Sequence, residues 1–145
     1  MNNPWIDLPF ESPFVIKDDW SAIEDFNSKN KQSDYEIKTS LFPEPYIGNL
    51  GAHVVLLGLN PGYSGNADEL DFTSEYFKGL CRDNLLHEKN EYPLYYFNPK
   101  LNHTSGYKWW KQKLREVICE AGARTVANEL LVLEYFPIIQ NVLNQ

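Results

Sequence analysis

The sequence predicts a single α/β domain, a three-layer α/β/α sandwich with a small, mainly parallel sheet. A continuous aliphatic run, HVVLLG at residues 53–58, is typical of a parallel strand that is buried on both faces. A tight turn and a helical pattern follow it and form the first half of a βαβ unit. The run LLVLEYF at residues 130–136 supplies a second buried strand. A chain of 145 residues is long enough for one such core.

Composition limits the class of protein. Hydrophobic residues make up 43% of the chain and charged residues 23%, as is usual for a globular domain. No apolar run reaches the length of a membrane span, and the first residues lack the pattern of a signal peptide, so we expect a cytoplasmic protein that does not bind a membrane. The net charge of −7 opposes long-range attraction to DNA.

The N-terminal third is expected to contribute little regular structure. Three prolines in residues 1–15 favour an extended segment that packs on the domain through Trp5, Phe10 and Phe14. Asp18 or Asp19 then caps a short helix, and residues 27–34 form a loop. The apolar face of this helix consists of Trp20, Ile23 and Phe26. Two prolines exclude residues 41–51 from a central strand.

The segments after the first strand have helical spacing. Asn66 and Glu69 resemble a capping box, and the helix that they begin carries Leu70, Phe77 and Leu80 on one face. Residues 95–97 fit a short edge strand. A longer helix is predicted over residues 105–121 and ends at Gly122. Its buried face is expected to be Tyr107, Trp110, Leu114, Val117, Ile118 and Ala121.

The tail, residues 138–145, is predicted to form at most one helical turn, so the sheet has few strands and an exposed edge. Val142 and Leu143 would cover part of that edge, and a homodimer through it would cover the remainder. The two cysteines, Cys81 and Cys119, lack the spacing of a zinc site and are interpreted as buried free thiols. We expect neither a metal nor a cofactor.

The turn Leu59-Asn60-Pro61-Gly62 is the best candidate for a ligand site. It follows the carboxyl end of a buried strand, where open α/β sheets place their ligands. Pro61 fixes one backbone angle, Gly62 permits close approach of a ligand, and Asn60 offers a carboxamide. The alternative role for Asn60 is structural, because turn asparagines often bond to their own backbone.

The segment PEPYIGNLGAHVVLLGLNPGYS, residues 43–64, resembles the first active-site motif of the uracil-DNA glycosylase superfamily. The likeness is greatest to branches whose turn reads Gly-x-Asn-Pro-Gly, the mismatch-specific and single-strand-selective enzymes. Pro-Glu-Pro-Tyr-x-Gly, residues 106–110 (GYKWW) and residues 134–137 (EYFP) are similar to an uncharacterised bacterial group of the superfamily. The resemblance covers roughly residues 41–137.

This resemblance implies a role for each residue of the turn. Asn60 would position the water that attacks the sugar as a flipped base leaves DNA, with no metal or cofactor. Gly62 stands where the classical enzymes carry a tyrosine that blocks the methyl group of thymine, so this pocket would exclude fewer bases. Tyr63 would stack on the base or pack against the next helix. The substrate-binding residues implied are Gly58, Leu59, Pro61, Gly62 and Tyr63.

The chain also departs from the family. The second motif, a His-Pro-Ser-type loop, is missing, and His103-Thr104-Ser105 stands in the wrong place for it. We therefore expect a C-terminally short or divergent domain. Two functions stay open: a DNA glycosylase that removes uracil or a related base, and a non-catalytic module that binds a nucleotide or a protein.

Other candidate residues have structural alternatives. The candidate DNA contacts are Lys108, Trp109 and Lys111. They belong to a basic cluster with Lys113 and Arg115, for which an ordinary solvated helix face is the favoured explanation. The acidic residues of the segment 68–75 lie in the first turns of a predicted helix, where the helix dipole stabilises negative charge. A catalytic carboxylate among them is the less favoured alternative. His53 is expected at a strand edge or in the core, and His87 and His103 on the surface.

Overall fold

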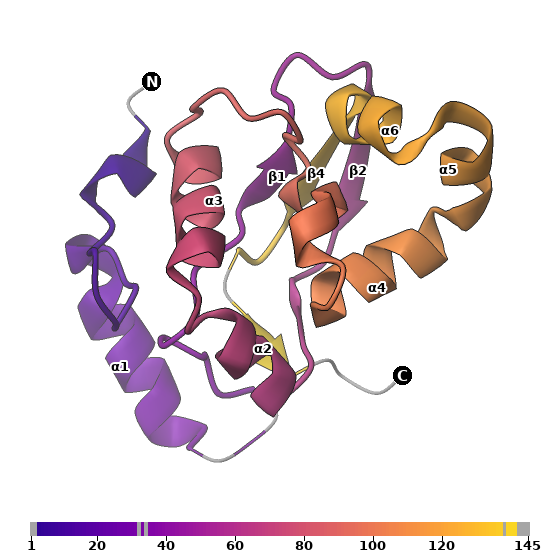
Figure 1. Cartoon of the computed structure of the whole chain (residues 1–145). Coiled ribbons are helices and arrows are strands. Elements are labelled where there is room, and N and C mark those ends of the chain that lie inside the picture. The colour runs from indigo at the N-terminus through magenta and orange to yellow at the C-terminus, as the bar shows by residue number, and fades with distance from the viewer. Residues whose placement is uncertain (1–2, 32, 34, 138, 142–145) are drawn as a thin grey trace.

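The computed structural model describes residues 3–31, 33, 35–137 and 139–141. Its centre is a three-stranded sheet in the order β1-β4-β2, formed by Tyr46–Gly48, Leu130–Glu134 and Val54–Gly58 (Figure 1). Strands β2 and β4 run parallel, as predicted, and β1 runs antiparallel to β4. The α/β class is confirmed, with a mixed sheet. A second, two-stranded parallel ladder joins β3 (Gly62–Tyr63) to β5 (Gln140–Asn141).

Six α-helices surround the sheet in the described part of the chain. They are α1 (Trp20–Lys29), α2 (Asn66–Asp71), α3 (Glu75–Leu85), α4 (Ser105–Lys113), α5 (Arg115–Ala121) and α6 (Ala123–Glu129). Four short 3₁₀ helices, η1 to η4, cover Pro4–Asp7, Lys17–Asp19, Tyr95–Phe97 and Pro99–Leu101. Figure 1 shows α1 and α3 on one side of the molecule and α4 to α6, in series, on the other. None of the described helices has the length and apolar character that crossing a membrane requires.

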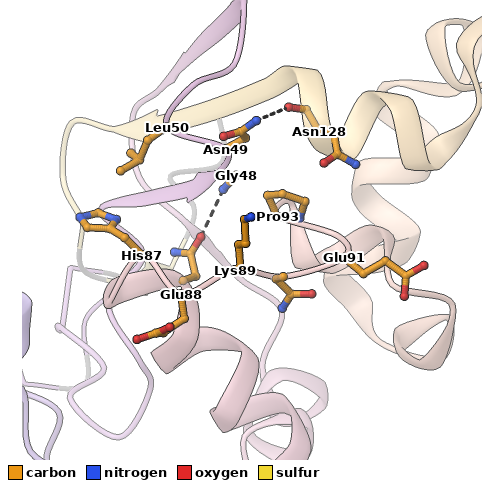
Figure 2. A pocket seen from close by; sticks show the side chains of 11 residues that line it. Gly48, Asn49, Leu50, His87, Glu88, Lys89, Glu91, Pro93 and Asn128 are labelled. Atoms are coloured by element: carbon orange, nitrogen blue, oxygen red, sulfur yellow. Dashed lines mark hydrogen bonds between the residues drawn. The ribbon is translucent and has the colours of Figure 1, made fainter.

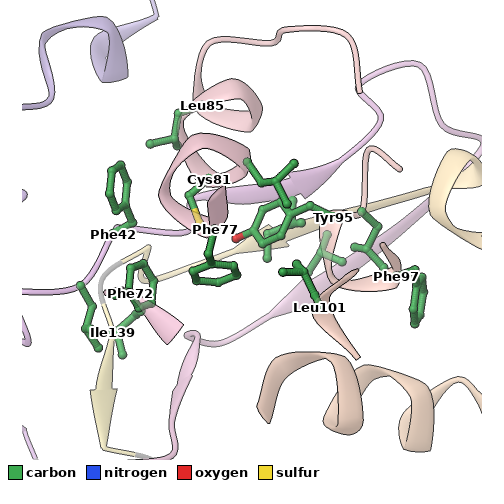
Figure 3. Packing of buried hydrophobic residues seen from close by; sticks show 14 of the residues in the cluster. Phe42, Phe72, Phe77, Cys81, Leu85, Tyr95, Phe97, Leu101 and Ile139 are labelled. Carbon is green, nitrogen blue, oxygen red and sulfur yellow. The ribbon is translucent and has the colours of Figure 1, made fainter. Parts of the chain in front are cut away.

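The core is rich in aromatic side chains (Figure 3). Phe77 of α3 packs edge-on against Phe72, with ring centroids 4.9 Å apart, and Phe42 stacks on Phe14 at 4.1 Å. Helix α3 reaches this core because its apolar residues recur every three or four positions, and those buried are Phe77, Leu80, Cys81 and Leu85. The sheet contributes Ile47, Leu56 and Val132 from one face, so the helices and this face share a single core.

The predicted burial of the first strand on both faces is wrong. Leu56 packs against the core, but Leu57 is 82% exposed and Val55 is half exposed. The reason is the layering: Leu56 lies on the face of β2 that packs on the core, whereas the described helices leave the face with Val55 and Leu57 open. Among the described residues β2 also pairs only with β4, so it lies at an edge of the sheet. Strand β1 lies at the other edge, which agrees with the exclusion of residues 41–51 from a central strand.

The helix predicted after the turn is divided in two. Asn66 lies inside α2 and does not cap it, and Leu70 is exposed. A new helix starts after Ser74, whose hydroxyl oxygen accepts the N–H of Phe77. This cap lets α3 take its own direction and bury Phe77 and Leu80.

The long helix predicted over residues 105–121 is also interrupted. Leu114, with ψ near 20°, separates α4 from α5, and no side chain of the two helices is fully buried. Val117 and Ala121 are exposed, so the proposed buried face is wrong at these positions. The end at Gly122 is confirmed, because that residue adopts a φ of +81°.

Several smaller predictions are also wrong. Residues 95–97 form a 3₁₀ turn and not an edge strand, and residues 140–141 form β5 and not a helical turn. Phe10 is exposed and lies under the guanidinium of Arg82 at 3.9 Å, whereas Phe14 is buried. Cys119 is exposed.

Helix α1 is confirmed, although it runs to Lys29 and buries only Ile23 of its predicted face. Its expected cap is wrong, since Asp19 makes no side-chain capping bond. The expected covering of the sheet edge by Val142 and Leu143 lies outside the described residues.

Candidate functional site

A cavity of about 280 Å³ lies at the carboxyl ends of β2 and β4. The turn after β2, the last residue of β4, helix α2 and the first residues of α4 all contribute to its lining. Its lining is Glu44, Ile47, Asn60, Pro61, Gly62, Tyr63, Ser64, Asp68, Asp71, Phe72, Phe77, Tyr96, Ser105, Gly106, Trp109, Trp110, Glu134 and Ile139. We call this space the carboxyl-end cavity. Its position is the one that open α/β sheets use for ligands.

Asn60 lines this cavity and also stabilises its own turn. Its side-chain N–H₂ donates to the carbonyl oxygen of Pro61 over 3.3 Å. Pro61 is buried, and Gly62 continues into β3 without a positive φ. The structural role foreseen for Asn60 is therefore present, and within the described chain its Oδ1 atom has no protein partner. That oxygen is the group available to a ligand or a water.

The structure brings together part of the predicted site. Asn60, Pro61, Gly62 and Tyr63 line the cavity, and so does Trp109, whose side chain is 51% exposed at the rim. Leu59 and Gly58 are outside the lining, and Leu59 is exposed. Lys108 and Lys111 are exposed on α4 and are not among the lining residues.

Gly58 lies beside the carboxyl group of Glu134. A Cβ atom at this position would lie 2.1 Å from the Oε2 atom of Glu134. The missing side chain therefore makes room for a carboxylate beside the strand. Gly106 acts in the same way for Tyr96, because its Cβ would lie 2.1 Å from the tyrosine ring.

Glu44 is the most deeply buried acid of the cavity. It is 7% exposed, and its Oε1 atom accepts the hydroxyl protons of Tyr95 and Tyr96, each over 2.7 Å. Burial raises the pKa of this carboxyl, and the two tyrosine hydrogen bonds oppose that rise. The backbone N–H of Glu44 donates to Pro137 O at 2.7 Å and so holds the residue next to the end of β4.

Glu134 is the second acid that the sequence analysis did not single out. Its Oε2 atom is buried and has no hydrogen-bond partner among the described residues. Burial, together with the nearby charge of Glu44, raises the pKa of Glu134 to about 7. A carboxyl of this kind is half protonated at neutral pH, and such groups cluster at functional sites.

Two further acids come from α2. Asp68 accepts the hydroxyl proton of Ser105 and the backbone N–H of Ser64, the latter over 2.5 Å, and so joins the turn to α4. Desolvation raises the pKa of Asp71. The helix-dipole interpretation of these acids is thus incomplete, because both line the cavity. No group of three or more His, Cys, Asp or Glu within the described ranges is arranged to hold a metal ion.

A larger space of about 480 Å³ lies at the opposite end of the sheet and is lined mainly by polar residues (Figure 2). Its asparagines bind backbone groups. Asn84 accepts the N–H of Gly48 over 3.2 Å and donates to Tyr46 O over 2.7 Å, and Asn49 donates to Asn128 O over 2.8 Å. We call it the amino-end pocket, and its side chains serve the fold.

No protein-family model, curated protein or solved structure matches this chain. Glu44 and Glu134 carried a signal in the sequence, since both stand in the short motifs, Pro43-Glu44-Pro45 and Glu134-Tyr135-Phe136-Pro137, on which the resemblance rests.

Proposed function

We propose that the carboxyl-end cavity binds a flipped nucleobase and that the chain hydrolyses the N-glycosidic bond of uracil or a related base in DNA. One observation carries the proposal: the carboxamide of Asn60 and the carboxyl group of Glu134, whose pKa is about 7, line the same cavity. Phe77, Tyr96 and Trp109 add flat apolar walls. A mostly apolar cleft with a few convergent polar groups is the usual form of a small-ligand site.

The two polar groups suit the two halves of this hydrolysis. Asn60 Oδ1 accepts a hydrogen bond from the attacking water and orients the water oxygen toward the anomeric carbon of the sugar. As that C–O bond forms, the C–N bond breaks, and its electron pair leaves with the base. The protonated Glu134 gives its proton to the departing base, and the proton of the water passes to the solvent, which restores the acid.

The proposal extends to DNA and to the fold. Trp109 at the rim would stack on a neighbouring base, while Lys108 and Lys111 on the same helix would meet phosphates. The full three-layer sandwich of a uracil-DNA glycosylase-like protein would need a helical layer over the exposed Val55 and Leu57. The described helices leave that face of β2 open.

A second function is favoured by the charge of the site. Four carboxyl groups line the cavity and the whole chain carries −7, which weakens attraction to a phosphate backbone. These features suit a module that binds a base or nucleoside without cleaving a polynucleotide.

Excision from oligonucleotides tests the proposal. Single- and double-stranded oligonucleotides are incubated with the protein at low salt; each carries one uracil, hypoxanthine, unpaired cytosine or unpaired adenine. The strands are then cleaved chemically at abasic sites, so that cleavage reports release of the base. We expect release of at least one base, with a rate that falls about 100-fold or more in Asn60→Ala, as for loss of a transition-state contact.

Asn102→Ala is the matched control, because Asn102 is exposed and lies outside the cavity lining. Its rate should equal that of the wild type. Folded wild-type protein that releases none of the four bases would refute the glycosylase and leave the binding module.

A further inference from the structure

The two glutamates of the carboxyl-end cavity have different surroundings. The side chain of Glu44 is buried, and its Oε1 atom accepts hydrogen bonds from the hydroxyls of Tyr95 and Tyr96, each over 2.7 Å. The Oε2 atom of Glu134 is buried and has no partner among the described residues. Hydroxyl donors stabilise an ionised carboxylate, whereas burial without a donor favours the protonated form. Glu44 is therefore the acid of the two that ionises first.

The main chain holds these two acids next to each other. The N–H of Glu134 donates to Pro45 O over 3.0 Å, directly beyond the last paired residues of β1 and β4. The N–H of Glu44 donates to Pro137 O over 2.7 Å. Both side chains reach the lining of the same cavity. The negative charge of Glu44 consequently opposes ionisation of Glu134.

A glycine gives each half of this arrangement its space. Gly106 lets the ring of Tyr96 lie against the first turn of α4, where its hydroxyl reaches Glu44. Gly58 leaves room for the carboxyl group of Glu134 beside β2. A methyl group at either position would have to displace one member of the network.

The cavity lining contains no lysine, arginine or histidine among the described residues, so no cation there balances the charge of Glu44. His103 and Lys108 act on Asp71, which lies on α2. The two tyrosine hydroxyls are thus the groups that stabilise the ionised Glu44. The other titratable groups that face the two glutamates or line the cavity with them are Cys81 of α3, Asp68 and Asp71 of α2, and Tyr63 of β3.

We propose that Glu44 is the ionised member of a carboxyl pair, a positioning residue whose charge keeps on Glu134 the proton that the departing base receives. Tyr95 and Tyr96 hold Glu44 in the ionised state through their hydrogen bonds. The inference rests on the proposed function of the same cavity, in which Glu134 is the acid. Two carboxyl groups whose surroundings separate their protonation states are a general way to keep one of them protonated near neutral pH.

Titration of the protein alone tests the pair without any substrate. Carboxyl ¹³C shifts of labelled glutamate report the protonation of each acid, and Glu44→Gln and Glu134→Gln assign the two signals. In the wild type we expect Glu44 to lose its proton at a lower pH than Glu134, whose midpoint lies near 7. In Glu44→Gln the midpoint of Glu134 should fall by about half a pH unit or more, because the opposing charge is gone.

Conservative variants separate charge from structure. Glu44→Asp keeps the charge, so it should return the midpoint of Glu134 toward the wild-type value. Tyr96→Phe keeps the ring and removes one donor, so Glu44 should lose its proton at a higher pH than in the wild type. Tyr107→Phe, outside the cavity lining, and Glu129→Gln, an exposed carboxylate at the end of α6, are the matched controls. Both should leave the two midpoints unchanged.

The pH profile of base release connects the pair to the reaction. At saturating substrate the wild-type rate should fall as the pH rises through about 7, where Glu134 loses its proton. In Glu44→Gln this fall should move to lower pH by the same amount as the midpoint of Glu134. A purely structural role of Glu44 would lower the rate at every pH and leave the position of the fall unchanged, which would overturn the proposal.

The titrations decide the pair independently of base release. An unchanged midpoint of Glu134 in Glu44→Gln, or a wild-type Glu44 that keeps its proton to a higher pH than Glu134, would overturn the pair. Should Glu44→Gln fail to fold, Tyr96→Phe decides alone, and a midpoint of Glu44 that does not rise would contradict the proposal. The expected titrations in a protein that releases none of the tested bases would support the carboxyl pair and refute the glycosylase.

Discussion

The two ends of the sheet use polar side chains in opposite ways. At the amino ends of β2 and β4, Asn49 and Asn84 are bound to backbone groups and hold β1 and the start of β4 in place (Figure 2). At the carboxyl ends, Oε2 of Glu134 is buried and has no hydrogen-bond partner among the described residues. Buried polar groups that serve the fold alone are normally paired, so the carboxyl-end cavity is the better candidate for ligand binding.

Two glycines, one at each end, give the sharpest test of this difference. A Cβ at Gly48 would lie 2.2 Å from the backbone oxygen of Leu130, and Gly48 has a φ of +121°. A Cβ at Gly58 would approach only the flexible carboxylate of Glu134. We expect Gly48→Ala to lose at least about 3 kcal/mol of unfolding free energy, or to fail to fold, because backbone strain adds to the clash.

Gly58→Ala should lose less than about 1 kcal/mol, since a side-chain end moves at low cost. Urea denaturation of both variants provides the comparison. Equal losses would show that the two ends are equally rigid and would contradict the distinction.

Asn84→Ala tests the amino end through hydrogen bonds. The substitution leaves the N–H of Gly48 and the carbonyl of Tyr46 without their partner, and each unsatisfied group costs about 1–3 kcal/mol when water cannot reach it. We expect a loss of about 2–3 kcal/mol in urea denaturation, with little change in ligand binding at the far cavity. Asn90→Ala, in the same pocket, is the control: it removes one local bond, from the N–H of Tyr92 two residues on, and should lose about 1 kcal/mol or less. A loss below about 0.5 kcal/mol in Asn84→Ala would show that these bonds are replaced by water.

Glu134→Gln tests the carboxyl end through pH. The folded pKa of about 7 lies above the usual value of 4.5, so between these values the folded protein binds more protons than the unfolded chain. The contribution of Glu134 to stability should therefore be fully present below about pH 4.5 and be lost as the pH rises through 7. The substitution should flatten this decline and raise the melting temperature at pH 8 by a few degrees, with little effect at pH 5.

A residual slope should remain in that variant, because the raised pKa of the buried Glu44 acts in the same direction. Differential scanning calorimetry at the two pH values gives the result. A difference in melting temperature between the wild type and Glu134→Gln that does not grow from pH 5 to pH 8 would contradict the raised pKa of Glu134.

The same contrast explains which predictions the sequence supported. The two strands and the position of the turn followed from aliphatic runs bounded by Pro and Gly, which are local signals. The interruptions of the predicted helices at residues 72–74 and at Leu114 depend on which side chains the tertiary structure buries. A continuous helical spacing of apolar residues in the sequence does not show where such interruptions fall. Glu44 and Glu134 lie 90 positions apart in the sequence, and only the pairing of β1 with β4 brings them to one cavity.

The smallest expected effect on stability concerns the open edge of the sheet. Leu57 is 82% exposed on β2, which pairs on one side only in the described structure, and Val55 beside it is half exposed. An uncovered apolar edge strand invites pairing with another strand, and a charged residue there blocks it. We therefore predict that the wild type self-associates with rising concentration in analytical ultracentrifugation and that Leu57→Lys is monomeric, with a stability change within about 0.5 kcal/mol.

Glu24→Lys on the exposed side of α1 controls for charge and should associate like the wild type. A wild type that stays monomeric at all concentrations would contradict pairing through β2, and a Glu24→Lys variant that also loses association would assign the effect to net charge.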